Sequence, residues 1–560
     1  MARHVLESIL AARVVHSIEP DQPPGPGDGR RQHVDAARLI RRRTCLGLAA
    51  LLAPLAGAPP ASATKRLLAP PFTVSPSQGP SVTWFDADSA LGAHGHEALR
   101  LLADAASHGL DPADYAVTPL DDTPASRAAF DAALTAAVLR WLNDLHVGRA
   151  GPAAGSTRAS SHRTGRFDAA DVLRAALAMQ DLSLAERAAV PPVPQYERLR
   201  DALATYRALS KHPAWQRALP ALPRRVEPGS TWAGAPLLAE RLHALGDLAV
   251  LPAARSLRAD DAIVDAVRAF QQRHGLEPDG VVGRATLAAL NVTPAQRARQ
   301  LELALERLRA APLLDAPRMI VVNIPEFVLR AYEVDNTERI ALRAQMKVIV
   351  GRALDTRTPL IEEDLRRIEF QPYWNVPASI ARKELLPLLA RDPAVWAREG
   401  FEFVIDGRVE PRSSNESLEA VREGRARIRQ RPGPRNALGD IKFVFPNRES
   451  IYLHHTPSTG LFERARRDFS HGCIRVEDPV ALAAFALQDV PGWDAARIRD
   501  AMGEGSPSNV ALPRPMPVLV AYGTALVKDG RVHFFDDIYG HDRVLDAALK
   551  ARSAAIAASR

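Results

Sequence analysis

The spacing of apolar residues predicts helices in the first half of the chain. Apolar residues recur with a helical period over 99–106 and again over 132–145, where Leu139, Leu142 and Leu145 share one face. Gly109 and the Asp111-Pro112 turn end the first of these patterns. We therefore expect residues 64–230 to form a helical N-terminal domain.

Three shorter helical patterns follow. They lie at 237–245, 261–274 and 284–290, and a Pro- and Gly-containing turn at 277–280 separates the last two. The spacing predicts a compact three-helix domain over 235–291. A charged amphipathic segment then predicts a connector helix within 292–317.

After residue 318 the apolar period becomes that of β-strands. Runs rich in β-branched residues at 319–324 and 346–350 end at Pro or Gly, and the runs 442–445 and 451–453 flank a turn at Pro446-Asn447. This pattern predicts a mainly antiparallel β domain.

Two further segments complete the expected multidomain α+β fold. A charged, helical-looking stretch at 376–432 interrupts the β domain of residues 318–495, and we expect it to be a helical insertion that caps the sheet. Within 496–560, the runs 517–527 and 531–535 flank Asp529-Gly530, which predicts a hairpin followed by a short helix.

The N-terminus has the pattern of an export signal. Arg41-Arg42-Arg43 precede a short apolar run at 45–53, and Ala61-Ser62-Ala63 supplies a cleavage pattern. We expect a signal peptide at 41–63 and a location in the periplasm or cell envelope; the alternative is a buried N-terminal helix. Residues 1–40 are expected to be disordered, and our hypothesis is that they reflect a mis-assigned start.

Charge and hydropathy limit the partners. The formal net charge is +7, and residues 1–63 contribute +3 of it. The rest of the chain has no dense basic run. We therefore expect no nucleic-acid partner. No further stretch approaches ~18 consecutive apolar residues, so we expect no membrane span after signal cleavage.

The cysteine content directs attention to one residue. Cys45 and Cys473 are the two cysteines, which excludes a disulfide scaffold and a four-thiolate zinc site. Signal cleavage would leave Cys473 alone. A lone exported thiol is either buried and inert or a working nucleophile.

Three histidines lie close to Cys473 in the sequence. His471 precedes it by two residues, and His454 and His455 lie 19 and 18 residues upstream at the end of an expected strand. An imidazole can take the proton of a thiol whose ordinary pKa is ~8.5 and return it to a leaving amine. Three interpretations stay open here: cysteine–histidine catalysis, a His/His/His/Cys metal site, or an inert buried cysteine.

One segment resembles the three-helix peptidoglycan-binding domain. The resemblance is carried by residues 266–276, by Asp279-Gly280-Val281-Val282-Gly283, and by residues 286–291. It implies the fold more directly than the binding, because the matching positions are core and turn positions. A spacer that has lost its ligand is the alternative.

A second resemblance covers residues 318–495. His454, followed after 15 residues by Ser470-His471-Gly472-Cys473, resembles the signature of the L,D-transpeptidase (YkuD-type) catalytic domain. Other short motifs resemble those of the large, multidomain, YcbB-like Gram-negative branch. They are Val350-Gly351-Arg352 with Thr358-Pro359, Pro372-Tyr373-Trp374-Asn375-Val376-Pro377, Asn436-Ala437-Leu438-Gly439 and Phe445-Pro446-Asn447.

The resemblance implies roles for the catalytic residues. Cys473 would be the nucleophile and His454 its general base. His455 would orient that imidazole through its backbone carbonyl, although two adjacent histidines then compete for the base role. His471 and Gly472 would be oxyanion-hole or positioning residues.

It also implies roles for the residues around them. Ser470 would be structural. Arg475 would hold the loop or meet a substrate carboxylate, and its alternative is an ion pair with Glu477 or Asp478. Tyr373, Trp374 and Asn375 would border the acyl-donor cleft or serve as core residues at a strand end.

The implied activity is formation of 3→3 cross-links between peptidoglycan stem peptides through a cysteine thioester, in cell wall biogenesis and without metal or organic cofactor. Carbapenem β-lactams are expected inhibitors, by acylation of Cys473. Water, a free D-amino acid or a protein lysine as acceptor would instead give an L,D-carboxypeptidase, an exchange enzyme or an anchoring enzyme. A non-catalytic wall-binding scaffold is the remaining alternative.

Overall fold

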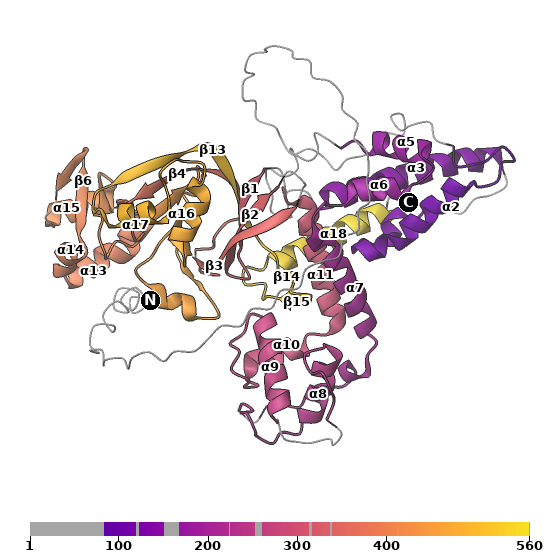
Figure 1. The fold of residues 1–560 in the computed structure, drawn as a ribbon, viewed down its shortest axis with the longest axis horizontal. Coiled ribbons are helices and arrows are strands. Elements are labelled where there is room, and N and C mark those ends of the chain that lie inside the picture. The colour runs from indigo at the N-terminus through magenta and orange to yellow at the C-terminus, as the bar shows by residue number, and fades with distance from the viewer. Residues whose placement is uncertain are drawn as a thin grey trace, which may run out of the picture.

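The computed structural model describes residues 83–118, 123–150, 167–222, 224–252, 260–312, 316–335, 339–354, 356–410 and 413–558. The expected signal peptide, residues 1–40 and Cys45 lie outside the described residues. Figure 1 shows a β-rich part at one end, a set of helices at the other, and a small helical unit that projects from between them.

The N-terminal part is helical, as expected. Its main helices are α2 (Ala93–Ala103), α3 (Pro124–Val147), α5 (Ala169–Ala178), α6 (Ser183–Ala189) and α7 (Pro194–Leu209). The Thr123 hydroxyl caps the start of α3, where Pro124 occupies the first turn, and Gly148 ends the helix. A buried core of Leu, Ala and aromatic side chains joins α2, α3, α5 and α6.

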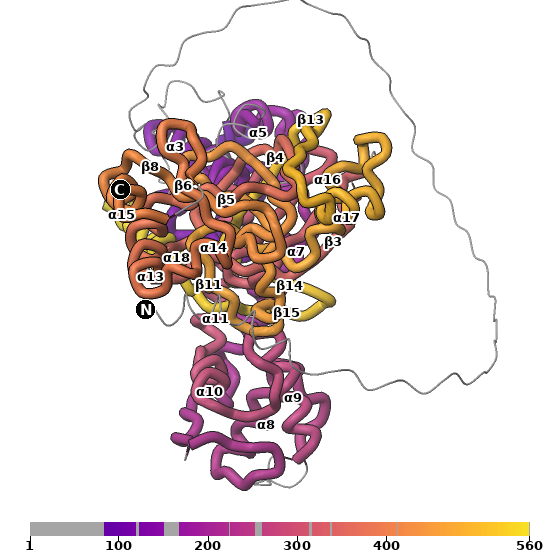
Figure 2. The backbone as a smooth tube through the Cα atoms, turned by 90° about the vertical axis from the view of Figure 1, so that its left-hand side faces the viewer, coloured from indigo at the N-terminus to yellow at the C-terminus, as the bar shows by residue number. Residues whose placement is uncertain are grey.

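The three-helix unit consists of α8 (Ala235–Ala244), α9 (Asp261–Arg273) and α10 (Arg284–Asn291). The predicted turn between α9 and α10 is present, with Gly280 at φ +78°. The buried Gln271 amide holds this turn, because it donates to Asp279 and accepts from the Gly280 N–H. The unit projects away from the rest of the molecule in both views (Figures 1 and 2).

Helix α11 (Pro294–Ala310) connects the parts. It begins with a capping box formed by Thr293 and Gln296. Near its end Glu306 is fully buried and pairs with Arg149 and Arg309. This buried ion cluster fixes α11 against the loop that follows α3.

The β-rich part is built on one nine-stranded sheet, in the order β11-β3-β12-β10-β9-β4-β13-β1-β2, with β2 also paired to β3. Its strands are β1 (Arg318–Asn323), β2 (Val328–Val334), β3 (Ile340–Gly351), β4 (Ile361–Phe370), β9 (Ile441–Val444), β10 (Leu453–His454), β11 (Asp468–Ser470), β12 (Ile474–Val476) and β13 (Ser508–Ala521). Most pairings are antiparallel, and β1–β13, β10–β12 and β11–β3 are parallel.

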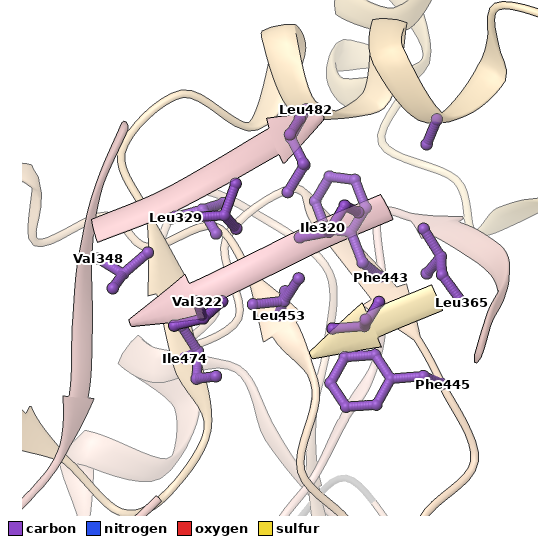
Figure 3. Packing of buried hydrophobic residues seen from close by; sticks show 14 of the residues in the cluster. Ile320, Val322, Leu329, Val348, Leu365, Phe443, Phe445, Leu453, Ile474 and Leu482 are labelled. Atoms are coloured by element: carbon purple, nitrogen blue, oxygen red, sulfur yellow. The ribbon is translucent and has the colours of Figure 1, made fainter. Parts of the chain in front are cut away.

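One face of this sheet carries the largest apolar core. Alternate residues of each strand point into it, among them Ile320, Leu329, Val348, Phe443 and Leu453, all fully buried (Figure 3). The helices α16 (Pro479–Leu487) and α17 (Ala495–Gly503) contribute Leu482 and Ile498 to the same core.

The C-terminal segment differs in part from the expectation. The hairpin around Asp529-Gly530 is present as β14 (Ala525–Lys528) and β15 (Arg531–Phe534). However, the expected strand 517–527 is divided, and its first part belongs to β13, between β4 and β1. The main sheet therefore extends beyond residue 495. Helix α18 (His541–Ala558) ends the described chain, and with 18 residues it is longer than the short helix expected.

The insertion between β4 and β9 is not simply helical, so that expectation was wrong in part. It has α12 (Ala378–Ile380), a π-helical turn η6 (Ala381–Leu385), α13 (Leu386–Arg391), α14 (Ala394–Glu399) and α15 (Asn415–Glu423). It also has a four-stranded sheet of β5 (Trp374–Asn375), β8 (Ala426–Gln430), β6 (Phe401–Ile405) and β7 (Arg408–Glu410). Charged residues on the outer faces of these short strands concealed their β period.

The insertion has its own core, which includes Trp396 and Phe403, with ring centroids 4.0 Å apart. Within the described ranges, no helix combines the length and the apolar character needed to cross a lipid bilayer.

Candidate active site

The register of two neighbouring strands, β10 and β12, brings the expected residues to one face of the sheet. Strands β10 and β12 are parallel, and their register puts His454 opposite Arg475. The Ile474 N–H donates to the Tyr452 carbonyl at 3.0 Å. Leu453 and Ile474 point into the core. Because side chains alternate along a strand, Tyr452, His454 and Arg475 point to the opposite face, beside Cys473.

Cys473 lies at the start of β12 in a partly enclosed environment. Its Sγ lies 3.8 Å from the Ser450 carbonyl oxygen, and the Tyr452 hydroxyl is within hydrogen-bonding reach. Burial raises the pKa of the Cys473 thiol above its ordinary value, which the hydrogen bonds from Tyr452 and the charges of Lys442 and Arg475 partly offset. The resting residue is therefore a thiol rather than a thiolate.

His454 is buried and held by backbone. Its Nδ1 faces the His455 carbonyl oxygen at 2.5 Å, so the neutral ring carries its proton on Nδ1 and leaves Nε2 as the basic atom. Burial and the charge of Arg475 lower the pKa of His454 to about 3. Within the described chain no hydrogen bond joins this ring to the Cys473 thiol, so proton transfer between them needs a rearrangement.

The loop before Cys473 has a fixed geometry. Gly472 has φ +115°, a conformation that side-chain-bearing residues rarely adopt, and a Cβ there would approach Ile451 to 3.0 Å. The Ser470 hydroxyl accepts from the Gly472 N–H and donates to the Cys473 carbonyl. The buried Thr358 hydroxyl donates to the Gly472 carbonyl at 2.8 Å. Both hydroxyls therefore brace the loop.

His471 joins this loop to the insertion. Its Nε2 lies 2.7 Å from the Glu384 carboxylate, which η6 supplies. The hydrogen bond from His471 lowers the pKa of Glu384, so the carboxylate is ionised near neutral pH. The insertion thus contacts the segment that carries the thiol.

The end of the insertion also meets the two adjacent histidines. The Asn436 amide, almost fully buried, donates to the carbonyls of Pro372 and Arg431 across the base of the insertion. Directly after it, the Leu438 carbonyl raises the pKa of His454, and Asp440 lies 3.4 Å from His455 Nδ1. His455 therefore contacts Asp440 through its ring and His454 through its backbone.

The other expected residues have the following contacts. Glu477 pairs with Lys347 and Asp478 caps α16, so the ion pair considered for Arg475 is absent from the described structure. The guanidinium of Arg429 lies 4.1 Å from the Tyr373 ring centroid, and β5 pairs with β8. Trp374 packs against the insertion core. The role of Tyr373, Trp374 and Asn375 at a cleft stays a prediction.

The metal-site interpretation gains no support from geometry. Among the described residues, no group of three or more His, Cys, Asp or Glu side chains is arranged to hold a metal ion. His471 faces Glu384 and His454 faces backbone carbonyls instead.

Four residues of this site had no role in the sequence interpretation. Tyr452 was detectable, because it lies two residues before His454 in a strand and so shares its face. Arg352 follows β3 and its N–H donates to the Ser470 carbonyl at 3.1 Å. Glu384 and Thr358 reach the site through tertiary contacts. Thr358 belongs to a motif that resembles the family, but no local pattern predicts the contact of either residue.

Comparisons with known families agree with this architecture. Residues 317–508 match the L,D-transpeptidase catalytic domain of the YkuD family, and residues 236–290 match the family described as "Putative peptidoglycan binding domain". Residues 77–203 match a scaffold domain. The chain thus carries a YkuD-type L,D-transpeptidase catalytic domain together with a peptidoglycan-binding domain.

A relative and two solved structures are similar to parts of the chain. A protein named "Putative L,D-transpeptidase" from Haemophilus influenzae is 33% identical over 254 residues, which cover 45% of this chain and 49% of that protein. The chain therefore aligns with about half the length of this relative.

The solved structures are an L,D-transpeptidase from Xylanimonas cellulosilytica and a fused Zn-dependent amidase/peptidase/peptidoglycan-binding domain-containing protein from Clostridium acetobutylicum. The first is 18% identical, covers 54% of this chain and 99% of its own, and has a TM-score of 0.17. The second is 19% identical, covers 26% and 70%, and has a TM-score of 0.12. Scores this low carry no weight for function.

Proposed function

We propose that this protein is a peptidoglycan L,D-transpeptidase that forms 3→3 cross-links through a thioester on Cys473. The observation that carries the proposal is the strand register that puts Cys473, His454 and Arg475 on one face of a YkuD-type domain. The peptidoglycan-binding domain in the same chain supports the same substrate.

In the first step, Cys473 Sγ attacks the carbonyl of the third residue of a tetrapeptide stem, a diamino acid. His454 Nε2 takes the thiol proton as the S–C bond forms. The C–N bond to the terminal D-Ala then breaks, and the proton passes from His454 to the leaving amine. Because the thiol and the imidazole both rest in their neutral forms, proton transfer accompanies the attack.

The loop geometry supports stabilisation of the oxyanion. The Gly472 N–H is already bonded to Ser470, whereas the N–H groups of His471 and Cys473 donate to no acceptor in the described chain. Backbone donors of this kind stabilise the negative oxygen of a tetrahedral intermediate. We assign the oxyanion to these two N–H groups, and Gly472 and Ser470 to positioning.

In the second step, the side-chain amine of another stem attacks the thioester. The amine proton passes through His454 to the departing Cys473 sulfur, which regenerates the thiol. The insertion supports this step because Glu384 closes it onto His471, and a closed site excludes the water that would hydrolyse the thioester. The proposed substrate and the export-signal pattern of the sequence both support a location outside the cytoplasm, in the cell envelope.

The test is incubation of the purified protein with disaccharide-tetrapeptide, followed by mass spectrometry of the products. A 3→3 cross-linked dimer, lost in the Cys473→Ala variant, is expected. Imipenem should add its mass to the Cys473 peptide. Products made only by hydrolysis or by exchange of D-Ala would identify a different acceptor, and full cross-linking by Cys473→Ala would refute the mechanism.

A further inference from the structure

Arg475 is a shielded cation without an anionic partner. Its Nε is inaccessible to solvent and makes no hydrogen bond, and no carboxylate in the described chain pairs with its guanidinium. Glu477 is engaged by Lys347, and the Asp478 side chain by the Ala481 N–H. The adjacent carboxylates are therefore in use elsewhere.

Arg475 itself is half-buried, and the four arginines of the described chain that are more deeply buried are all satisfied. Arg273 pairs with Asp247 and Arg309 with Glu306. Arg241 and Arg467 donate to several backbone carbonyls. Arg200 and Arg552 also have a shielded nitrogen without a hydrogen bond, but both side chains pair with carboxylates. Arg475 has a shielded nitrogen and no carboxylate partner, which is costly for a charged group and needs a reason.

The position of Arg475 supplies that reason. It lies opposite His454 in the paired strands and two residues beyond Cys473, on the face that carries the thiol. Burial lowers the pKa of Arg475, and the charge of Arg352 adds to this lowering, whereas the negative form of Cys473 opposes it. The unpaired cation is therefore beside the reacting sulfur.

Arg352 makes the arrangement a pair. It follows β3, which lies next to β12, and its backbone is tied to Ser470 in the loop before the thiol. Its side chain has no hydrogen bond or ion pair in the described structure. Its nearby carboxylate, Glu384, is bonded to His471. The charge of Arg352 acts unfavourably on Arg475, and an anion shared by the two would remove that repulsion.

We propose that Arg475 and Arg352 form a carboxylate-binding subsite that holds a carboxylate of the acyl donor beside Cys473. An arginine fork fits a carboxylate with two parallel hydrogen bonds. The nature of the donor rests on the proposed function. A stem peptide offers two carboxylates near the bond that breaks, on the leaving D-amino acid and on the diamino acid itself.

The subsite is tested without any transpeptidation, by alkylation of the full-length protein with iodoacetate and iodoacetamide. The two reagents react at the same sulfur, and iodoacetate alone carries a carboxylate. Peptide mapping by mass spectrometry separates Cys473 from Cys45. We expect alkylation of Cys473 by iodoacetate to saturate, and its rate relative to iodoacetamide to exceed that of a model thiol at least tenfold.

Variants then separate recognition from thiol chemistry. Arg475→Gln and Arg352→Gln should abolish the saturation and most of the preference, and Arg475→Lys should keep part of the preference without saturation. Arg514→Gln, an exposed arginine paired with Asp489, is the matched control. A wild-type ratio in Arg475→Gln, or equal slowing of both reagents, would overturn the subsite.

Thermal unfolding gives a readout that does not depend on alkylation. Removal of a half-buried cation that has no partner should leave the unfolding midpoint of Arg475→Gln unchanged or raise it. A clear fall of the midpoint would assign Arg475 a structural role and overturn the proposal.

Donor peptides identify the bound carboxylate once cross-linking is measured. Amidation of either the terminal D-Ala or the diamino acid should slow acylation at least tenfold in the wild-type protein and have no effect in Arg475→Gln. Equal rates with all donors would refute the subsite while leaving the transpeptidase assignment intact.

Discussion

The Glu384 carboxylate accepts a hydrogen bond from His471 Nε2 at 2.7 Å, across 87 residues of sequence. Glu384 belongs to the insertion between β4 and β9, and His471 lies two residues before the thiol. The position of the insertion and the geometry of the thiol loop are thereby linked. Figure 1 places the insertion (α13, α14, α15 and β6) at the end of the molecule farthest from the N-terminal helices.

Loss of this link should loosen the closed site. We expect Glu384→Ala to slow cross-linking about tenfold, since a hydrogen bond to a charged group contributes ~1.5 kcal/mol or more. The share of hydrolysed product should rise because water enters. Product analysis by mass spectrometry measures both effects. Glu419→Ala is the control, because Glu419 lies exposed on the same insertion and pairs with Arg422; equal effects in the two variants would refute the link.

Gly472 should tolerate no side chain. Its φ of +115° and the 3.0 Å approach of a Cβ to Ile451 require a shift of the loop that presents Cys473. We expect Gly472→Ala to lower the rate of imipenem acylation about 100-fold, at a stability cost of about 1–3 kcal/mol. Gly460→Ala is the control, because an added Cβ meets nothing within 4 Å there. Wild-type acylation by Gly472→Ala would contradict the assigned geometry.

The pH dependence of acylation should reflect the buried base. Burial lowers the pKa of His454 to about 3, helped by the charge of Arg475, so the imidazole is neutral well below pH 6.5. Acylation of Cys473 by imipenem should therefore not fall between pH 8 and pH 5, as it would with an ordinary imidazole. Stopped-flow absorbance measures this rate, and a decline centred near pH 6.5 would contradict the assignment.

The same residue should make stability depend on pH. The unfolded chain binds a proton at His454 below about pH 6.5, and the folded chain does not until about pH 3. The contribution of neutral His454 to the free energy of unfolding is thus present above pH 6.5. It is lost as the pH falls from about 6.5 toward about 3. Between pH 6.5 and pH 5, the wild-type free energy of unfolding should fall by about 2 kcal/mol more than that of His454→Gln. Urea titrations at both pH values check this, and parallel declines would refute it.

The ion cluster at the end of α11 should dominate the stability of the helical part. Replacement of Glu306 removes the carboxylate that Arg149 and Arg309 share in this buried cluster. We expect Glu306→Gln to lower the free energy of unfolding by about 3–5 kcal/mol. Glu302→Gln on the same helix, whose pairs with Arg207 and Arg299 are partly exposed, should cost less than about 1 kcal/mol. Urea unfolding of both variants measures the contrast, and equal losses would contradict it.

Local patterns in the sequence were enough for most of the secondary structure. The three helices of the small domain fall within two residues of their predicted ends, because Asp260 and the turn at 277–280 mark them. The division of 517–527 between two sheets was not visible, because Pro, Val and Leu suit either strand equally. The sheet inside the insertion was missed for a similar reason: its short strands carry charge on their outer faces.

The sequence by itself determined which residues are candidates for chemistry, since Cys473 and the spacing of His454 from Ser470-His471-Gly472-Cys473 are properties of one local pattern. It could not determine what surrounds them. Glu384, Thr358 and Arg352 reach the thiol loop through contacts between distant segments, and only the tertiary structure decided which carboxylates remain for Arg475. The physical reason is that pairing and burial of a charge depend on the neighbours that folding brings together, and these have no fixed spacing along the chain.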